Sequence, residues 1–194
     1  MALEFEEHPF WDYSIGVYGT KGVPAACLVL QDRHEIDVNV LLYCSWVGHS
    51  GRGVLTPPQL SAALATVDEW HRDVVSALRA VRQSLKGGMS PALLSQSDAL
   101  RSHILNAEVD CEHAEQLMLA NSIELPPNAG LPMEQRAEDS IVNIASYFHA
   151  CGKICDEADL RQLAIILGAA FSGLDGKRIV TLSRGIMQAG TGTG

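Results

Sequence analysis

The sequence predicts an all-α fold: an orthogonal and antiparallel helical bundle of about seven helices, with a long central helical hairpin. Apolar residues recur at intervals of three and four along most of the chain, which places them on one face of a helix. The breaks between these runs contain proline, glycine or side chains that cap helices. No two neighbouring segments show the alternation of apolar and polar residues that is typical of paired strands.

Three helices are expected in the first quarter of the chain. The first runs from Pro9 to Val17, with proline in its first turn. The second starts at Pro24 and runs to about His34. Apolar residues occupy most of its circumference, so we expect it to be buried on more than one side. Asp37 precedes the third helix, because its carboxylate can accept a hydrogen bond from a backbone amide of the first turn.

A long helical hairpin is expected in the middle of the chain. It follows a glycine-rich loop at 48–53, interpreted as a plain connection, and a helix start at Thr56-Pro57-Pro58. The two long helices are predicted at about 66–86 and 97–120. One carries basic and the other acidic residues, so we expect ion pairs between them, each contributing about 0–1 kcal/mol if exposed. The predicted apolar stripes are Val67, Trp70 or His71, Val74, Leu78, Val81 and Leu85 in the first helix, and Leu100, Ile104, Ala107, Cys111, Ala114 and Met118 in the second.

A linker at 124–132, with three prolines in nine residues, separates the hairpin from a predicted C-terminal helix pair. The first helix of the pair is expected at about 133–150, and Asp156 is placed to cap the second. The predicted divisions are an N-terminal helical domain at 1–122, a C-terminal helix pair at 133–175 packed on or beside it, and a frayed tail at 176–194.

Composition and charge indicate an acidic protein with a sizeable hydrophobic core. The chain has 194 residues, of which 47% are hydrophobic and 19% charged, so it can bury a sizeable core. Its net charge of −9 makes nucleic-acid binding an unfavoured function. The start lacks a signal peptide, and the longest apolar stretch, 163–174, is too short and too rich in glycine and alanine to span a bilayer. Five cysteines in helical contexts are expected to be free thiols, which predicts a cytoplasmic protein without membrane contact.

The first part of the chain resembles an uncharacterised proteobacterial family of short proteins that carries a domain of unknown function. The resemblance covers about residues 8–87 and implies a bacterial cytoplasmic setting, but it brings no activity with it. The matching residues are Phe10-Trp11-Asp12-Tyr13-Ser14, Gly22-Val23, Ala26-Cys27-Leu28, Leu30-Gln31-Asp32-Arg33-His34, Asp37-Val38-Asn39, Leu41-Leu42 and Trp46, with a weaker match at Trp70 and Leu78-Arg79-Ala80-Val81-Arg82.

The corner between the second and third helices is the first candidate binding site. Charged side chains gather there beside aromatic ones, so carboxylates could act as acid, base or ligand anchors in a polar pocket. The alternative is a purely structural corner, in which Asp37 caps the third helix and Arg33 braces the turn by reaching Asp37. The candidate pocket residues are Trp11, Asp32, Arg33, His34, Asp37, Asn39, Tyr43 and Trp46.

The first long helix provides a candidate partner surface. Arg72, Arg79, Arg82 and Lys86 form a basic ridge that could bind RNA or an acidic partner. The alternative is a solvated face whose charges are paired within the protein.

Two Asp-x-x-His motifs, Asp68/His71 and Asp110/His113, lie on the two predicted hairpin helices. Helical bundles that bind two metal ions use related Glu-x-x-His motifs, but they need further carboxylates that are not evident here. We therefore expect no metal and no cofactor, with these four residues as the candidates if a metal is bound. No catalytic triad can be assembled from the sequence.

These observations favour a non-enzymatic protein-interaction or adaptor module with an unidentified protein partner. A second copy of the same chain, in a homo-oligomer, is a further candidate partner. The alternative is a small helical enzyme, or a protein that binds a cofactor or metal at the 32–37 corner or at the Asp-x-x-His pairs. The interaction module is favoured by the segregated charge and by the lack of a complete catalytic set. The enzyme or cofactor-binding protein requires that the polar residues of the corner, or of the Asp-x-x-His pairs, converge in space.

Overall fold

The computed structural model describes residues 3–86 and 94–186, and within these ranges it contains helices and no strand, which confirms the all-α class. In the same ranges, no helix combines the length and apolar composition needed to cross a bilayer. The helices are α1 (Pro9–Tyr18), α2 (Val23–His34), α3 (Val38–His49), α4 (Pro57–Trp70), the π-helical turn η1 (His71–Val75), α5 (Ser76–Ser84), α6 (Leu94–Asn121), α7 (Met133–Ala150), α8 (Glu157–Ala170) and α9 (Gly176–Ser183).

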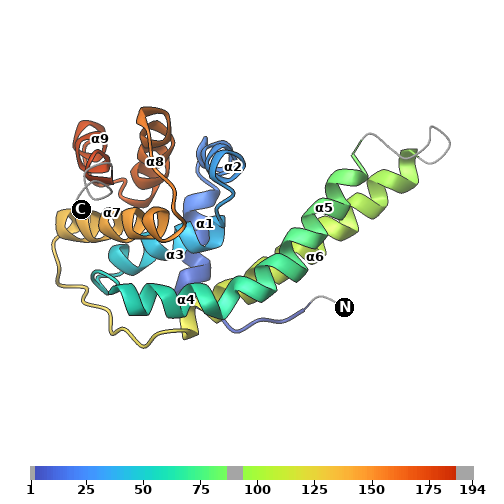
Figure 1. The fold of residues 1–194 in the computed structure, drawn as a ribbon, viewed down its shortest axis with the longest axis horizontal. Coiled ribbons are helices and arrows are strands. Elements are labelled where there is room, and N and C mark those ends of the chain that lie inside the picture. Colours follow the sequence, from blue (N-terminus) through green and yellow to red (C-terminus); the bar gives the residue numbers. More distant parts are fainter. Residues whose placement is uncertain (1–2, 87–93, 187–194) are drawn as a thin grey trace.

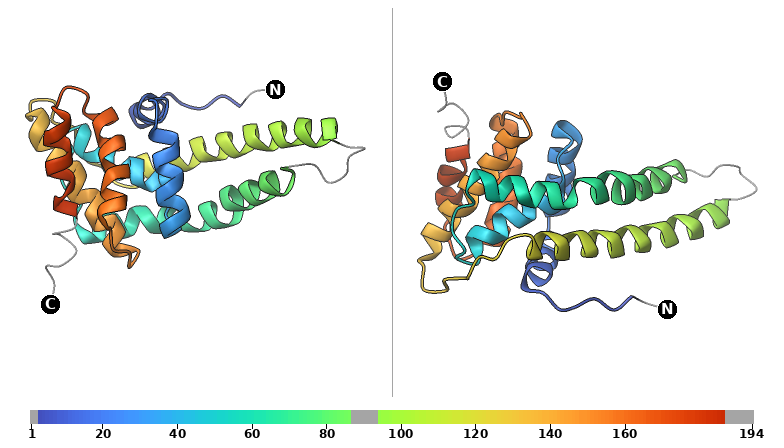
Figure 2. Two further views of the ribbon diagram at one scale, coloured as in Figure 1. Left: turned by 90° about the horizontal axis from the view of Figure 1, so that it is seen from above. Right: turned by 60° about the horizontal axis from the view of Figure 1, so that its bottom comes forward.

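The body of the molecule is built around α3, and the hairpin of α5 and α6 projects from it (Figure 1). α3 packs most extensively on α7 and also contacts α1 and α6, while α2 packs on α8 and α8 on α9. In both views of Figure 2, α4 and α5 run alongside α6. The predicted long hairpin is therefore present, with α4 as part of its first arm.

α3 is buried along nearly its whole length, from Asn39 to Gly48. Its sequence is apolar around the whole circumference, which is the pattern of a helix enclosed by others. A single hydrophobic core joins α3 to side chains of the C-terminal helices, among them Ile144, Phe148 and Leu163. The C-terminal helices thus complete the core that the N-terminal ones begin.

Several helix starts lie where the sequence predicts them, although α2 begins one residue and α6 three residues earlier than expected. α1 and α4 both begin at a proline, and α7 has the predicted bounds. The Asp37 carboxylate accepts a hydrogen bond from the Asn39 amide at 2.7 Å, which confirms it as the cap of α3. Asp156 caps α8 in the same way, accepting from the amides of Ala158 and Asp159. Local capping chemistry is therefore sufficient to set these boundaries.

The π-helical turn η1 changes which side of the first hairpin arm faces α6. A π turn adds one residue to the helix, so the residues after it are rotated by about 100° from their expected positions. Accordingly, Val75 is the buried residue in place of the predicted Val74, and Val81 is 48% exposed instead of belonging to an inward stripe. Arg79 and Arg82 take the inward positions and contact α6.

The facing side of α6 is more polar than predicted. Leu100, expected in its apolar stripe, is 54% exposed, whereas Glu108, Glu115 and Gln116 are buried. The physical reason is that this side of α6 faces the rotated guanidinium groups of the first arm, which require charged partners.

The segment expected to begin a frayed tail forms α9. Asp175 caps this helix by accepting a hydrogen bond from the Lys177 amide at 2.7 Å. Ile179 is buried, and α9 packs on α8 and α7. A cap and a buried isoleucine thus stabilise a helix in a segment whose glycine content suggested fraying. The last residues of the predicted tail, 187–194, lie outside the described ranges.

α3 and α7 approach each other most closely at Gly48. A Cβ atom there would lie 2.2 Å from the backbone nitrogen of Ser140, so the contact requires glycine. The Ser140 hydroxyl donates a hydrogen bond to the Ser45 carbonyl oxygen at 2.7 Å. On the next turn of α7, the Asn143 side-chain oxygen accepts from the Leu55 amide at 2.7 Å. α7 therefore fixes both α3 and the loop that follows it.

We predict that Gly48→Ala destabilises the protein by about 2 kcal/mol or more, because the added methyl group forces α3 and α7 apart. Urea unfolding followed by circular dichroism measures the change. Gly16→Ala is the matched control, since a Cβ at that helical position meets nothing within 4 Å and should leave stability unchanged or improve it slightly. Equal stabilities of the two variants would contradict the assignment of a close crossing.

Candidate functional site

A groove with a volume of about 810 Å³ lies between α1, α2 and α3 on one side and the α5–α6 hairpin on the other. Residues from both regions singled out in the sequence line it: Trp11, Asp32 and Asn39 from the corner, and Arg79, Arg82 and Lys86 from the basic ridge. The corner and part of the ridge thus form one surface. The other lining residues are Ser14, Ile15, Tyr18, Gly19, Leu28, Gln31, Val38, Leu42, Gln83, Arg101, Val109, Glu112 and Gln116.

The groove combines apolar walls with positive charge. Ile15 and Leu28 are 53% and 49% exposed, and Val109 opposite them on α6 is also exposed. Within the described ranges, Lys86 and Arg101 form no ion pair. Exposed apolar side chains next to uncompensated cations are features of a binding surface more than of a solvated face.

Arg79 and Arg82, in contrast, are paired within the hairpin. Arg79 binds Glu108 at 3.0 Å and Glu112 at 2.8 Å, and its remaining nitrogen donates to Gln31 on α2 at 2.9 Å. Burial acts to raise the pKa of Glu108, but hydrogen bonds from Arg82 and Arg79 outweigh it and lower that pKa. The cross-pairs predicted between the hairpin helices therefore exist, and they are partly buried instead of exposed.

A buried polar cluster lies next to the groove and consists of Asp37, His71 and Glu115. The Nδ1 atom of His71 is 3.0 Å from Asp37 Oδ2 and 3.0 Å from Glu115 Oε1. Asn39 donates a hydrogen bond to the other Glu115 oxygen at 2.6 Å, and Gln116 donates to the Asn39 side-chain oxygen at 2.8 Å. Asn39 and Gln116 also line the groove, so they connect it to the cluster.

The cluster shifts the pKa values of two of its members. Burial by itself lowers the pKa of His71, but the close contacts with the Asp37 and Glu115 carboxylates and their negative charges outweigh it and raise that pKa to about 10. Burial raises the pKa of Glu115, against the opposing hydrogen bonds from His71 and Asn39. The geometry therefore holds positive charge at the imidazole between two carboxyl groups.

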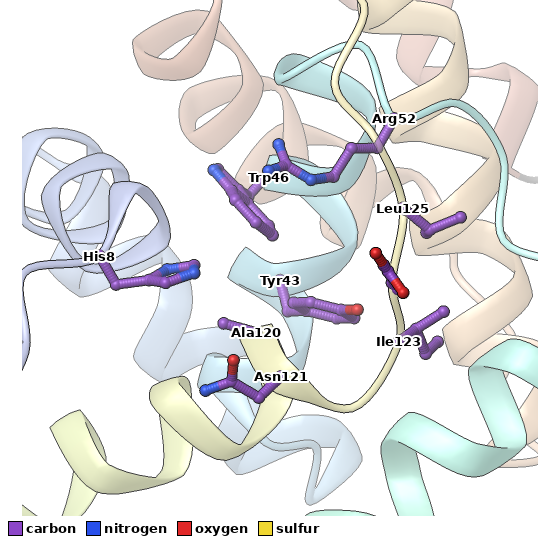
Figure 3. Close-up of a pocket in the computed structure, with 9 residues that line it drawn as sticks. His8, Tyr43, Trp46, Arg52, Ala120, Asn121, Ile123 and Leu125 are labelled. Atoms are coloured by element: carbon purple, nitrogen blue, oxygen red, sulfur yellow. The ribbon is translucent and has the colours of Figure 1, made fainter.

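A second, smaller pocket of about 240 Å³ lies on another side of α3 (Figure 3). Tyr43 and Trp46, assigned to the corner site from the sequence, line this pocket instead of the groove. Arg52 extends over the Trp46 ring, with its guanidinium carbon 4.1 Å from the ring centroid. His8 contacts the same ring edge-on at 5.7 Å. The aromatic residues expected near the corner are thus divided between two surfaces, because Tyr43 and Trp46 share one face of α3, whereas Trp11 lies on α1.

Arg33 and His34 line neither pocket. Arg33 binds Asp156 at 2.8 Å and also contacts Asp159, and His34 lies 3.0 Å from Asp159. They join α2 to the N-terminus of α8, so Arg33 does not brace Asp37 as the sequence suggested. The reason is that Glu35 adopts the left-handed conformation, with φ of 54°, and ends the helix before an i,i+4 contact can form.

The two Asp-x-x-His pairs are not brought together. His71 belongs to the buried cluster, whereas Asp68 is exposed and pairs with a neighbouring arginine. His113 stacks on Trp11, with ring centroids 3.7 Å apart and planes 3° apart. Within the described ranges, Asp110 joins no group of three potential ligand atoms.

Sequence reasoning missed Glu115, Gln116 and Arg101. The acidic residues of α6 are expected from the sequence to pair with the basic arm of the hairpin, but the Glu115 side chain is fully buried and contacts His71. The available signal was its position four residues after Cys111, which was assigned to the inward stripe. A polar residue at such a position requires a buried partner, and here that partner is His71.

The family comparison matches residues 9–119, which span α1 to nearly the end of α6. The chain belongs to the DUF2390 family, described as proteins of unknown function. The DUF2390 match is longer than the expected 8–87 and includes Asp37, His71 and Glu115, but it leaves out α7, α8 and α9. No curated protein and no solved structure matches the chain.

We predict that Arg79→Met destabilises the protein by about 2 kcal/mol, because it leaves Glu108 with a single guanidinium and removes the contact with Gln31. Arg72→Met is the matched control: Arg72 pairs with Asp68 and Asp73 on the exposed surface, so its loss should cost less than about 0.5 kcal/mol. Urea unfolding of both variants tests whether the partly buried pairs of Arg79 stabilise the fold. An effect at Arg79 as small as that at Arg72 would contradict this role.

Proposed function

We propose that the protein is a protein-interaction module of the bacterial cytoplasm, and that its groove binds an acidic amphipathic helix of a partner protein. The observation that carries this proposal is one groove that combines exposed apolar side chains with two cations that form no ion pair within residues 3–86 and 94–186. Amphipathic helices bind other proteins by placing apolar residues at helical spacing into such a groove.

The apolar contacts explain why the partner segment is amphipathic. Ile15, Tyr18 and Leu28 remain exposed although they lie on helices whose other faces are buried. Val109 on α6 is exposed across the groove from them. Covering one large apolar side chain contributes about 1.5–3 kcal/mol, so a few anchors are enough for micromolar binding.

The charge distribution explains why the segment is acidic. The chain as a whole carries a net charge of −9, yet four of the six charged residues that line the groove are basic. Arg79 and Arg82 are paired with Glu108 and Glu112 of α6, which leaves Lys86 and Arg101 as the accessible cations of the groove. An acidic partner is attracted to this groove and repelled by the rest of the surface.

The alternative, a small helical enzyme that uses the same groove, is supported by a different observation. Asn39 and Gln116 line the groove and connect it to the buried cluster of Asp37, His71 and Glu115. In that case a small polar molecule would occupy the inner end of the groove, and the outer cations would contribute little to its binding.

We predict that a fluorescent acidic amphipathic peptide of about 18 residues binds with micromolar affinity, and that a peptide with the same apolar residues and lysines in place of the acids does not. Fluorescence anisotropy measures both. Replacing Lys86 and Arg101 together by glutamate should weaken binding of the acidic peptide at least about 10-fold and reduce its dependence on salt, because the groove charge is reversed.

The double variant Arg161→Glu and Lys177→Glu is the control. It makes the same charge change at exposed positions on α8 and α9 that do not line the groove, and it should bind the peptide normally. Equal binding of the acidic and basic peptides, or full binding by the Lys86 and Arg101 variant, would rule out the proposal.

A further inference from the structure

Three potential metal ligands converge at the cluster beside the groove. Asp37 lies just before α3, His71 opens the π-helical turn and Glu115 lies on α6, so the ligands come from separate elements. One ligand atom from each lies within 4.8 Å of the other two. Only tertiary packing brings these three atoms together, and each side chain is largely or fully buried.

A proton at His71 Nδ1 does not account for this arrangement. Within the described ranges, the nitrogen meets hydrogen-bond geometry toward Glu115 only, whereas the buried Asp37 Oδ2, which is also 3.0 Å away, lies outside that geometry and accepts from no other donor. The single Nδ1–H group is therefore directed at Glu115 and leaves Asp37 Oδ2 with a charge contact alone. Leaving a buried carboxylate oxygen without a partner is costly, so a further group is expected at the point where the three atoms converge.

We propose that Asp37, His71 and Glu115 bind a divalent transition-metal cation of the class of Mn²⁺, Fe²⁺ or Zn²⁺. One imidazole nitrogen and two carboxylate oxygens are a suitable donor set for these ions. The separation of 3.0 Å between Nδ1 and each oxygen equals the edge of an octahedron with metal–ligand bonds of about 2.1 Å. The cation replaces the Nδ1 proton, as metal binding to histidine requires.

Asn39 holds both carboxylates in position for this role. Its backbone amide donates to Asp37 Oδ1 at 2.7 Å, and its side chain donates to Glu115 Oε2 at 2.6 Å. Each carboxylate therefore has one oxygen fixed by Asn39 and the other facing His71. Ligating carboxylates in metalloproteins are commonly oriented by such hydrogen bonds.

The residues around the three ligands are compatible with the charge of a divalent cation and with its remaining coordination positions. Two carboxylates and a neutral imidazole carry the charge that a divalent cation balances. Three protein ligands leave positions for water or substrate. Among the residues that the structure describes, the buried Gln116 Oε1 has no hydrogen-bond partner; it is an acceptor for such a water, and Gln116 also lines the groove. The π-helical turn at His71 is consistent with a functional role, since such turns are frequent at functional sites.

The proposal is tested on the untagged full-length protein after dialysis against a chelator. Isothermal titration with Mn²⁺ and Zn²⁺, and with Fe²⁺ under anaerobic conditions, should show one site per chain for at least one ion, with a rise in the melting temperature. Glu115→Gln and His71→Asn should abolish that site. Asn39→Ala keeps all three ligands and should weaken binding about 10- to 100-fold.

His103→Asn, which replaces an exposed histidine of α6, is the control and should bind the cation as the unmodified protein does. Circular dichroism establishes that each variant is folded, and Glu115→Gln is the decisive one because it preserves the shape of the side chain. The proposal fails if no ion binds stoichiometrically, or if folded Glu115→Gln binds with unchanged affinity. These titrations do not involve the peptide, so they are independent of the proposed groove partner.

Discussion

The packing of α7 on α3 is the constraint on which the rest of the structure depends. α3 is buried from Asn39 to Gly48 and carries apolar residues around most of its circumference, and α7 covers it at a distance that only Gly48 permits. The same contact reaches the N-terminal end of α3, next to the polar cluster. The Tyr147 hydroxyl accepts a hydrogen bond from the Asp37 amide at 2.9 Å, and it is 3.3 Å from the Asp37 carbonyl oxygen. A helix outside the DUF2390 match thus holds the residue that begins the polar cluster.

The two arms of the hairpin are held together mainly by ion pairs. They meet through guanidinium and carboxylate groups more than through an apolar seam, because η1 rotates Arg79 and Arg82 inward. Partly buried ion pairs of this kind contribute modestly to stability, since desolvation offsets much of their attraction. Their geometric demands nevertheless fix the register of α5 against α6. That register places Lys86 and Arg101 at the groove.

The groove and the polar cluster share two residues, Asn39 and Gln116. A change in the charge held by the cluster therefore acts directly on side chains that line the groove. Asn39 is central to this link, because its backbone and side chain contact Asp37 and Glu115 respectively. Whatever occupies the groove lies within hydrogen-bonding reach of a network that continues into the buried cluster.

The sequence by itself determined the helical class, the main helix boundaries and the long hairpin. These follow from local rules: Asp37 and Asp156 cap their helices as predicted because a cap involves only neighbouring residues. Only the tertiary structure decided which polar residues meet. A single π turn changed the inward face of the hairpin, and Glu115 became a buried partner of His71 across 44 residues. Periodicity assumes an uninterrupted α-helix and reports on one element at a time, so neither the rotation nor the convergence of Asp37, His71 and Glu115 could be read from it.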